Sequence, residues 1–343
     1  MNARKNYFRS CFKENLMPLF FITLISLVYC LIFAVLYQPF RYYLDYDNYV
    51  TYYRTTLEYP VIVLGLLCYI VPVLQFKRFK KRRHLDLYYS VPVSRREVGA
   101  THFLVGLITV VVPYTLCYLE NFIVMLTRPV GSYDFLPMIG HYFLCLLLGI
   151  FSYSLFSFVF NQANTVIDGC IFMVIYSFAF ALLTEPIELL LRNTVNIRNF
   201  GIEPVTLLGN ATLYFENLIE LKTVYGYSSF YDSYIQIWQI IAWMIVGVVA
   251  LILFLLLFGR QPAEKTEEIS DSWFGYKVLI PVLAALAMLI YSLPANDGGV
   301  ITWFWVELIT LIAYTVYRRG LRYKKSDIAV LLALCAFLPV YLL

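Results

Sequence analysis

The fold class of this chain follows from one stretch of its sequence, Leu251-Ile-Leu-Phe-Leu-Leu-Leu-Phe258, which is apolar at every position. A strand of a membrane β-barrel would alternate apolar and polar residues with a period of two. The stretch is instead apolar on all faces, which is typical of a helix that lipid or protein surrounds. The whole chain of 343 residues is 61% hydrophobic and 14% charged, whereas soluble chains carry about 25% charged residues. The composition therefore predicts an all-α polytopic membrane protein.

Nine apolar segments are candidates for membrane-spanning helices, since about 20 residues are needed to cross the hydrocarbon core. They cover residues 17–37, 60–76, 101–126, 136–160, 166–184, 234–258, 278–293, 300–317 and 328–343.

Lys and Arg are distributed unequally between the two sets of connections. Twenty of the 26 lie in the N-terminal segment and in the connections 77–97, 259–277 and 318–326. The other six are Arg41, Arg54, Arg128, Arg192, Arg198 and Lys222. Because cytoplasmic loops carry the excess of Lys and Arg, we predict a cytoplasmic N-terminus. Nine spans then place Leu343 outside, where the sequence is still apolar, and our hypothesis is that an extracytoplasmic domain follows.

The longest outer connection, 185–233, is acidic and carries two short apolar patches, Pro186 to Leu191 and Val205 to Leu208. Loops of this length are usually functional or separately folded. We expect the patches to form helices that lie on the outer leaflet or dip into it. The tyrosines at positions 42–53 favour an interfacial belt over a ligand-stacking surface.

Several classes of protein are excluded by composition and by missing motifs. The net charge of +4 is too small to favour general binding of nucleic acid. The sequence holds no ATP-binding loop, no H-E-x-x-H zinc helix and no G-x-S-x-G nucleophile elbow. His84, His102 and His141 stand apart, and we interpret them as interfacial or hydrogen-bonded histidines. We therefore expect no catalytic residue, no metal and no cofactor.

Ionisable residues within the spans are candidates for function, because a charge there costs about 2.5–3.5 kcal/mol on insertion scales. Glu120, next to Asn121, lies near the outer half of the third span, and Glu307 has a similar place in the eighth. These three residues are our candidates for a substrate path. For Glu120 two interpretations stay open: it faces a path or a subunit contact, or it pairs with a polar group of a neighbouring helix.

The first large cytoplasmic connection, residues 77–100, carries the most specific pattern. A basic cluster from Lys77 to Arg83 fits positive-inside topology and contact with anionic lipid. Further along, Ser94 is followed by Arg95, Arg96 and Glu97. A serine three residues before a glutamate is typical of a capping box. The pattern thus predicts a helix that begins after Ser94 at the membrane surface.

This connection resembles the S-x-P-[IV]-S-R-R-E element of permease subunits of bacterial type 2 ATP-binding cassette (ABC) exporters. The matching residues are Ser90, Pro92, Val93, Ser94, Arg95, Arg96 and Glu97. The resemblance implies that they form a coupling helix, which docks on a separate ATPase subunit.

The resemblance covers residues 1 to about 275 and implies a domain organisation. Residues 1–16 would form an amphipathic connecting helix, residues 17–258 a six-span permease core, and residues 259–277 a cytoplasmic linker. Three additional spans in residues 278–343 depart from the family core. The stretch Gly259 to Thr266 is more weakly similar to an R-x-x-E-x-x-G element. When Glu264 is taken as the glutamate of that element, Glu267 stands where glycine is expected.

The function that the resemblance implies is that of a non-catalytic transmembrane subunit of an ATP-driven exporter in the bacterial cytoplasmic membrane. Its partners would be ATPase subunits, a second permease copy or sister permease, and membrane lipids. Its cargo would be amphipathic or lipid-like, with resistance to antimicrobial peptides or cell-envelope antibiotics as one setting. The alternatives are a membrane receptor or scaffold for an outer domain and a membrane-embedded enzyme.

Overall fold

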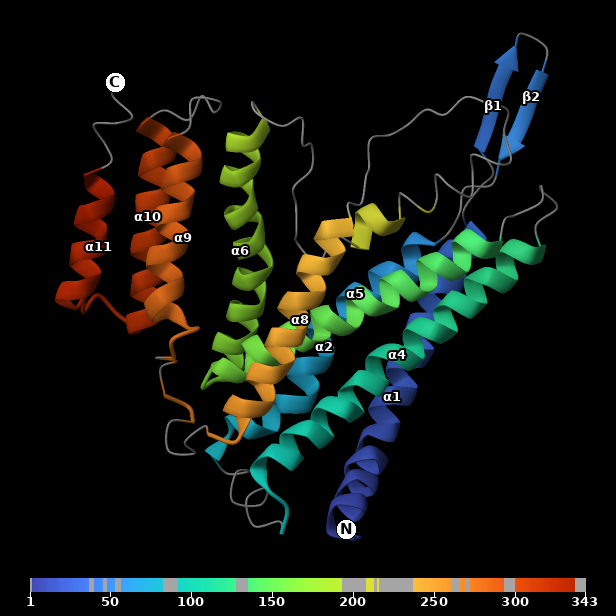
Figure 1. Ribbon diagram of the computed structural model, residues 1–343, viewed down its shortest axis with the longest axis horizontal. Coiled ribbons are helices and arrows are strands. Elements are labelled where there is room, and N and C mark those ends of the chain that lie inside the picture. The colour runs from blue at the N-terminus through green and yellow to red at the C-terminus, as the bar shows by residue number, and fades with distance from the viewer. Residues whose placement is uncertain are drawn as a thin grey trace. The chain divides into compact units, whose positions relative to one another are not determined.

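The computed structural model describes residues 2–36, 40–45, 48–52, 57–82, 92–127, 135–192, 208–212, 215, 237–260, 266–268, 270, 272–292 and 300–336. Most of these residues are helical, and the fold is that of an all-α membrane protein, as the composition predicts (Figure 1).

The helices are long and follow the apolar segments of the sequence closely. Their bounds are Asn2–Leu36 (α1), Glu58–Phe76 (α2), Arg95–Thr127 (α4), Phe135–Gln162 (α5), Val166–Arg192 (α6), Ile237–Phe258 (α8), Tyr276–Ser292 (α9), Val300–Arg318 (α10) and Lys325–Cys335 (α11). A short 3-10 helix, Lys77–Lys80, follows α2. Five helices, α1, α2, α4, α5 and α8, are long and apolar enough to cross a membrane within the described part of the chain. That all nine predicted segments cross it stays a prediction.

One element was not expected from the sequence. Strands β1 (Phe40–Asp45) and β2 (Asn48–Tyr52) form an antiparallel hairpin within the tyrosine-rich connection, with Phe40 opposite Tyr52. The pairing shifts between Tyr43 and Asp45.

Two helices run across positions where the sequence analysis separates segments, and each of them contains a proline there. The connecting helix of residues 1–16 is not separate, because α1 continues through Pro18. The patch Pro186 to Leu191 is not a separate surface helix, because α6 runs to Arg192. A single proline removes one backbone hydrogen bond and can kink a helix without ending it. Of the second patch, residue 208 is described and lies in the helical stretch 208–212, whereas 205–207 lie outside the described residues.

The chain divides into two compact units. Unit 1 comprises residues 1–76, 87–158 and 204–261, and unit 2 comprises residues 77–86, 159–203 and 262–343. In unit 1, α4 lies alongside α1 and α2 (Figure 1).

Aromatic side chains and glycines make the close helix contacts of unit 1. Phe103, Phe254 and Phe258 are buried, and the Phe103 and Phe254 ring centroids lie 5.5 Å apart. A Cβ atom at Gly99 of α4 would lie only 2.6 Å from Phe258 Cδ1 of α8. Small residues let helix backbones approach closely where no hydrophobic effect drives association. Gly99 therefore sets the distance between α4 and the end of α8.

Unit 2 is centred on α6, α9, α10 and α11. Buried apolar side chains from the last three helices, Ala284, Met288, Val306 and Leu334, pack together. The Tyr276 ring of α9 packs on Phe172 of α6, at a centroid distance of 4.7 Å, and on Tyr317 of α10, at 5.4 Å. These contacts join the additional helices to α6.

Part of the predicted cytoplasmic linker, 259–277, is folded onto unit 2. The Ser270 hydroxyl donates to Asp168 Oδ2 at 2.8 Å and accepts from the backbone N–H of Asn164 at 2.8 Å. The Tyr276 hydroxyl donates to Asp168 Oδ1 at 3.1 Å. Glu267 has a φ of 69°, a left-handed conformation that favours glycine. The chain thus keeps a glycine-type conformation at the position where the resemblance expects glycine.

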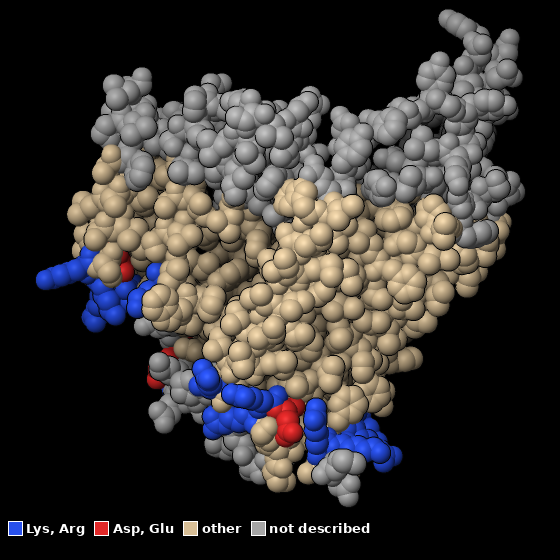
Figure 2. Space-filling model, viewed as in Figure 1, with Lys and Arg blue, Asp and Glu red and all other residues tan. Residues whose placement is uncertain are grey.

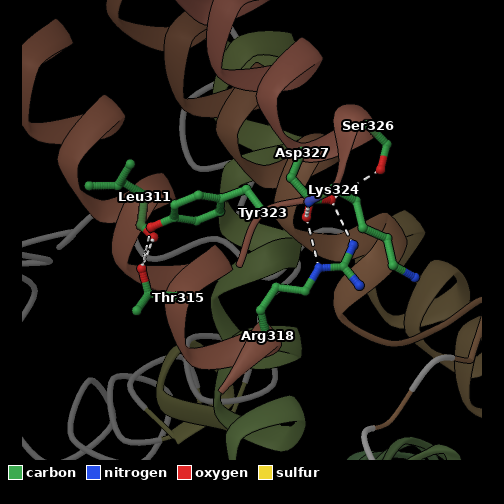
Figure 3. Close-up of polar contacts among 7 residues, drawn as sticks. All are labelled: Leu311, Thr315, Arg318, Tyr323, Lys324, Ser326 and Asp327. Atoms are coloured by element: carbon green, nitrogen blue, oxygen red, sulfur yellow. Dashed lines mark hydrogen bonds and ion pairs between the residues drawn. The ribbon is translucent and has the colours of Figure 1, made fainter. Parts of the chain in front are cut away.

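An ion pair holds the start of α11 to the end of α10 (Figure 3). Arg318 donates to both carboxylate oxygens of Asp327, from Nε at 2.7 Å and from Nη2 at 2.8 Å. The backbone N–H of Lys324 also donates to Asp327, at 3.0 Å. Burial raises the pKa of Asp327, but these hydrogen bonds outweigh burial and hold the pKa below its ordinary value.

We expect Gly99→Ala to lower the stability of unit 1 by about 1–3 kcal/mol, because the added methyl group would overpack against Phe258. Gly65→Ala in α2 is the matched control, since a Cβ there meets nothing within 4 Å. The control should leave stability unchanged or raise it by up to about 1 kcal/mol. Unfolding in detergent would measure both, and equal effects would contradict the packing role of Gly99.

We expect the α10–α11 connection to lose stability in acid. Because the pKa of Asp327 is lowered in the folded protein, its contribution is present above the unfolded pKa, about 4, and is lost as the pH falls through the folded pKa. Asp327→Asn should remove this pH dependence and cost about 1–3 kcal/mol. Hydrogen exchange of the α11 backbone amides between pH 7 and pH 3 would measure this loss of stability. An unchanged pH profile in the variant would refute the assignment.

Candidate functional site

The predicted coupling residues lie at the start of α4, and the capping box predicted there is confirmed. The backbone N–H of Glu97 donates to Ser94 Oγ at 3.3 Å, and the backbone N–H of Ser94 donates to Glu97 Oε2 at 3.3 Å. Helix α4 accordingly begins at Arg95. Pro92 is described and exposed, whereas Ser90 lies outside the described residues.

The end of α8 supports the first turns of α4. Phe258 packs on Gly99, as described above, and a Cβ atom at Gly259 would lie 2.8 Å from Arg96 Cγ. The stem of Arg96 is thereby packed against the chain, although the residue as a whole is exposed. Arg95 is also exposed, and Val93 and Glu97 are half-buried. We call the exposed residues Pro92, Ser94, Arg95 and Arg96 the α4 surface.

Other basic residues share the end of unit 1 that carries the α4 surface. Near their first residues α1 and α4 are in contact: the Tyr7 hydroxyl hydrogen-bonds with His102 Nε2 at 3.1 Å. The basic residues of the first turns of α1, such as Arg4 and Lys5, are exposed. On the face in Figure 2, the described Lys and Arg side chains gather at one end of each unit, next to a broad uncharged surface. A basic end next to an uncharged surface is the distribution expected where membrane helices leave the lipid on the cytoplasmic side.

Buried polar contacts connect α1, α2 and α4 next to this surface. Cys11 Sγ lies 3.6 Å from His102 Nδ1, and Gln75 Nε2 donates to Asn15 Oδ1 at 3.0 Å. His102 is hydrogen-bonded, in agreement with its interpretation from the sequence. The contacts themselves could not be predicted, because they join residues more than 50 positions apart.

Glu120 and Asn121 lie further along the same helix, on the side of α4 that meets α1. Glu120 and Cys117 both lie close to Cys30 of α1. Asn121 is completely buried, and its amide donates to the Cys117 carbonyl at 3.1 Å. Glu120 Oε2 and Asn121 Oδ1 are buried without a hydrogen-bond partner among the described residues. The structure therefore shows no polar neighbour that satisfies Glu120 Oε2.

Glu307 belongs to unit 2, whereas Glu120 and Asn121 belong to unit 1. Its partner is Cys335 of α11, whose thiol lies 3.8 Å from Glu307 Oε1. Oε2 of Glu307 is buried and has no partner within the described ranges. Glu307 thus faces α11 at a partly exposed position.

A buried polar cluster around His141 was not predicted from the sequence. His141 is completely buried and hydrogen-bonds with the Tyr118 hydroxyl at 3.2 Å and with Thr212 Oγ1 at 3.3 Å. Cys145 Sγ lies 3.3 Å from His141 Nε2. The signal available was the spacing of His141 and Cys145, one helical turn apart. The cluster attaches residues 208–212, from the long connection, to α4 and α5.

No family model, curated protein or solved structure matches this chain. Within the described residues, no group of three or more His, Cys, Asp and Glu side chains could hold a metal ion.

We expect Ser94→Ala to loosen the first turn of α4, because the cap on the Glu97 backbone N–H is lost at a cost of about 1 kcal/mol. Amide exchange of residues 95–98 should then rise about fivefold. Ser94→Asp is the matched control, since aspartate is an equally good cap. Equal exchange in all three proteins would show that the capping box does not stabilise this turn.

Proposed function

We propose that the chain is a non-catalytic transmembrane subunit of an ATP-driven ABC exporter in the bacterial cytoplasmic membrane. It would form the translocation path with a second permease copy or a sister permease. A separate ATPase subunit would supply the energy. The observation that carries the proposal is the α4 surface, a capped helix start with exposed Arg95 and Arg96.

Helix α4 connects the α4 surface to the part of the chain that we expect inside the membrane. It is continuous over 33 residues, which is about 50 Å. The α4 surface stands at one end, and Glu120 and Asn121 stand near the other. A displacement of the first turn by a docked partner would therefore be transmitted along the helix. Pro113, between the two regions, removes one backbone hydrogen bond and provides a place where α4 can bend.

We further propose that the cargo is amphipathic or lipid-like. Glu120 and Asn121 are the groups that would meet it in unit 1, with Glu307 as a further candidate in unit 2. In support, Glu120 carries an oxygen without a hydrogen-bond partner among the described residues. A carboxylate at this depth would favour a cationic group on the cargo. Resistance to antimicrobial peptides or cell-envelope antibiotics is the setting that fits such cargo.

The test is co-purification of an ATPase subunit with the tagged protein from its native membrane in mild detergent. We expect Arg95→Glu with Arg96→Glu to reduce the recovered ATPase at least tenfold, because two exposed cations become anions at the α4 surface. Arg4→Glu with Lys5→Glu is the matched control: it makes the same charge change on exposed residues of α1 and should retain the ATPase.

Two results would count against the exporter assignment. Unchanged recovery and ATP turnover in the Arg95 and Arg96 variant would place coupling elsewhere. Reproducible absence of any ATPase from the unmodified protein would instead favour a membrane receptor or scaffold, or a membrane-embedded enzyme.

A further inference from the structure

The connection between α10 and α11 has no role in the exporter proposal, yet it is a strongly basic segment of unit 2. Five of the eight residues from Arg318 to Lys325 are Lys or Arg, and Asp327 is the only acidic residue from 308 to 343. We call residues 318–325 the basic turn. It joins the eighth and ninth predicted spans, so we expect it to lie where these helices leave the hydrocarbon region.

Asp327 neutralises only one of these cations. Its two carboxylate oxygens are bound by Arg318 (Figure 3). The Arg318 guanidinium also lies over the Tyr317 ring, 4.3 Å from the ring centroid. The four remaining basic side chains are exposed: Arg319, Arg322, Lys324 and Lys325. The turn therefore presents four positive charges that its own acidic residue does not compensate.

Hydrogen bonds keep these cations together on a fixed backbone. The backbone N–H of Gly320 donates to the Thr315 carbonyl at 3.1 Å, and that of Arg319 donates to the Val316 carbonyl at 3.1 Å. The hydroxyls of Tyr323 and Thr315 are 2.8 Å apart and fasten the turn to α10 (Figure 3). An ordered frame lowers the entropy cost of binding a ligand between the cations.

Exposed apolar side chains lie at the same end of unit 2. Leu321, within the turn, is 78% exposed. Trp273 is 82% exposed and stands three residues before Tyr276, whose ring packs on Tyr317. Cations beside an exposed leucine and tryptophan suit the membrane interface, where phosphates and acyl chains meet.

We propose that the basic turn is a binding site for the phosphate headgroups of anionic phospholipids. Arg319, Arg322, Lys324 and Lys325 contact the headgroup, and Leu321 inserts beside the acyl chains. The charge of the turn selects an anionic over a zwitterionic lipid, and the predicted cytoplasmic orientation faces the leaflet whose surface is negative. The additional helices would then anchor unit 2 to such lipids.

The test compares the association of spin-labelled phosphatidylglycerol and phosphatidylcholine with the full chain reconstituted in vesicles. We expect the unmodified protein to prefer phosphatidylglycerol. Replacing Arg319, Arg322, Lys324 and Lys325 with Gln should reduce this preference at least about fivefold. The matched control replaces the four basic residues of the first turns of α1 with Gln: Arg4, Lys5, Arg9 and Lys13. It removes equal charge and should keep most of the preference.

Each other result overturns the proposal. A preference that survives in the basic-turn variant places lipid selectivity elsewhere, and an equal loss in both variants shows a diffuse effect of surface charge. If the fourfold variant does not reconstitute, Arg322→Gln with Lys324→Gln, two exposed positions, decides in its place. The double variant Arg319→Lys with Arg322→Lys retains both positive charges and should therefore retain the preference for phosphatidylglycerol.

The proposal is independent of the exporter assignment, and the same variants separate the two. The basic-turn variant should still co-purify with an ATPase subunit if one binds at the α4 surface. Loss of the ATPase with an unchanged lipid preference would show that the turn binds protein, and would overturn the lipid site.

Discussion

Lipid cannot hydrogen-bond to a peptide group, so each backbone N–H and C=O inside a membrane has to find its partner within the protein. A chain that is 61% hydrophobic meets this constraint with long helices, and the helices of this protein reach 35 residues in α1. The same constraint determines where the polar side chains can lie. Exposed charges gather at the helix ends, and the polar groups within the helices are mostly turned toward a neighbour, as His141 is toward Tyr118 and Thr212.

Local interactions explain what could be predicted from the sequence. The Ser94–Glu97 capping box joins residues three positions apart, so the start of α4 was predictable. The apolar segments predicted the helices for the same reason, because each segment is continuous in the sequence. The continuity of α1 through Pro18 and of α6 through Pro186 was not predicted, because apolar content marks the part of a helix that can lie in lipid and not where the helix begins or ends. His141 and Thr212 meet across 71 positions, and no periodicity in one sequence encodes such a contact.

Contacts of this long-range kind also give the cytoplasmic linker its structure. By composition residues 259–277 are a solvated connection, yet Ser270 and Tyr276 both donate to Asp168. Asp168 therefore joins the segment before α9 to the start of α6. The backbone of this segment is also closely determined by the fold, because Glu267 adopts a left-handed conformation although it is not glycine.

The two proposals give the charged surfaces of the two units different tasks. In unit 1 the α4 surface lies at one end of a continuous helix that also carries Glu120, an arrangement that the exporter proposal would use to pass a mechanical displacement inward. In unit 2 the basic turn is fastened at Thr315 and Asp327, so its cations are held in place. A coupling surface has to move with its helix, whereas an anchor has to resist movement. Under the two proposals, the hydrogen bonds within the basic turn suit an anchor and Pro113 within α4 suits a moving surface, so two surfaces of the same charge would have opposite mechanical roles.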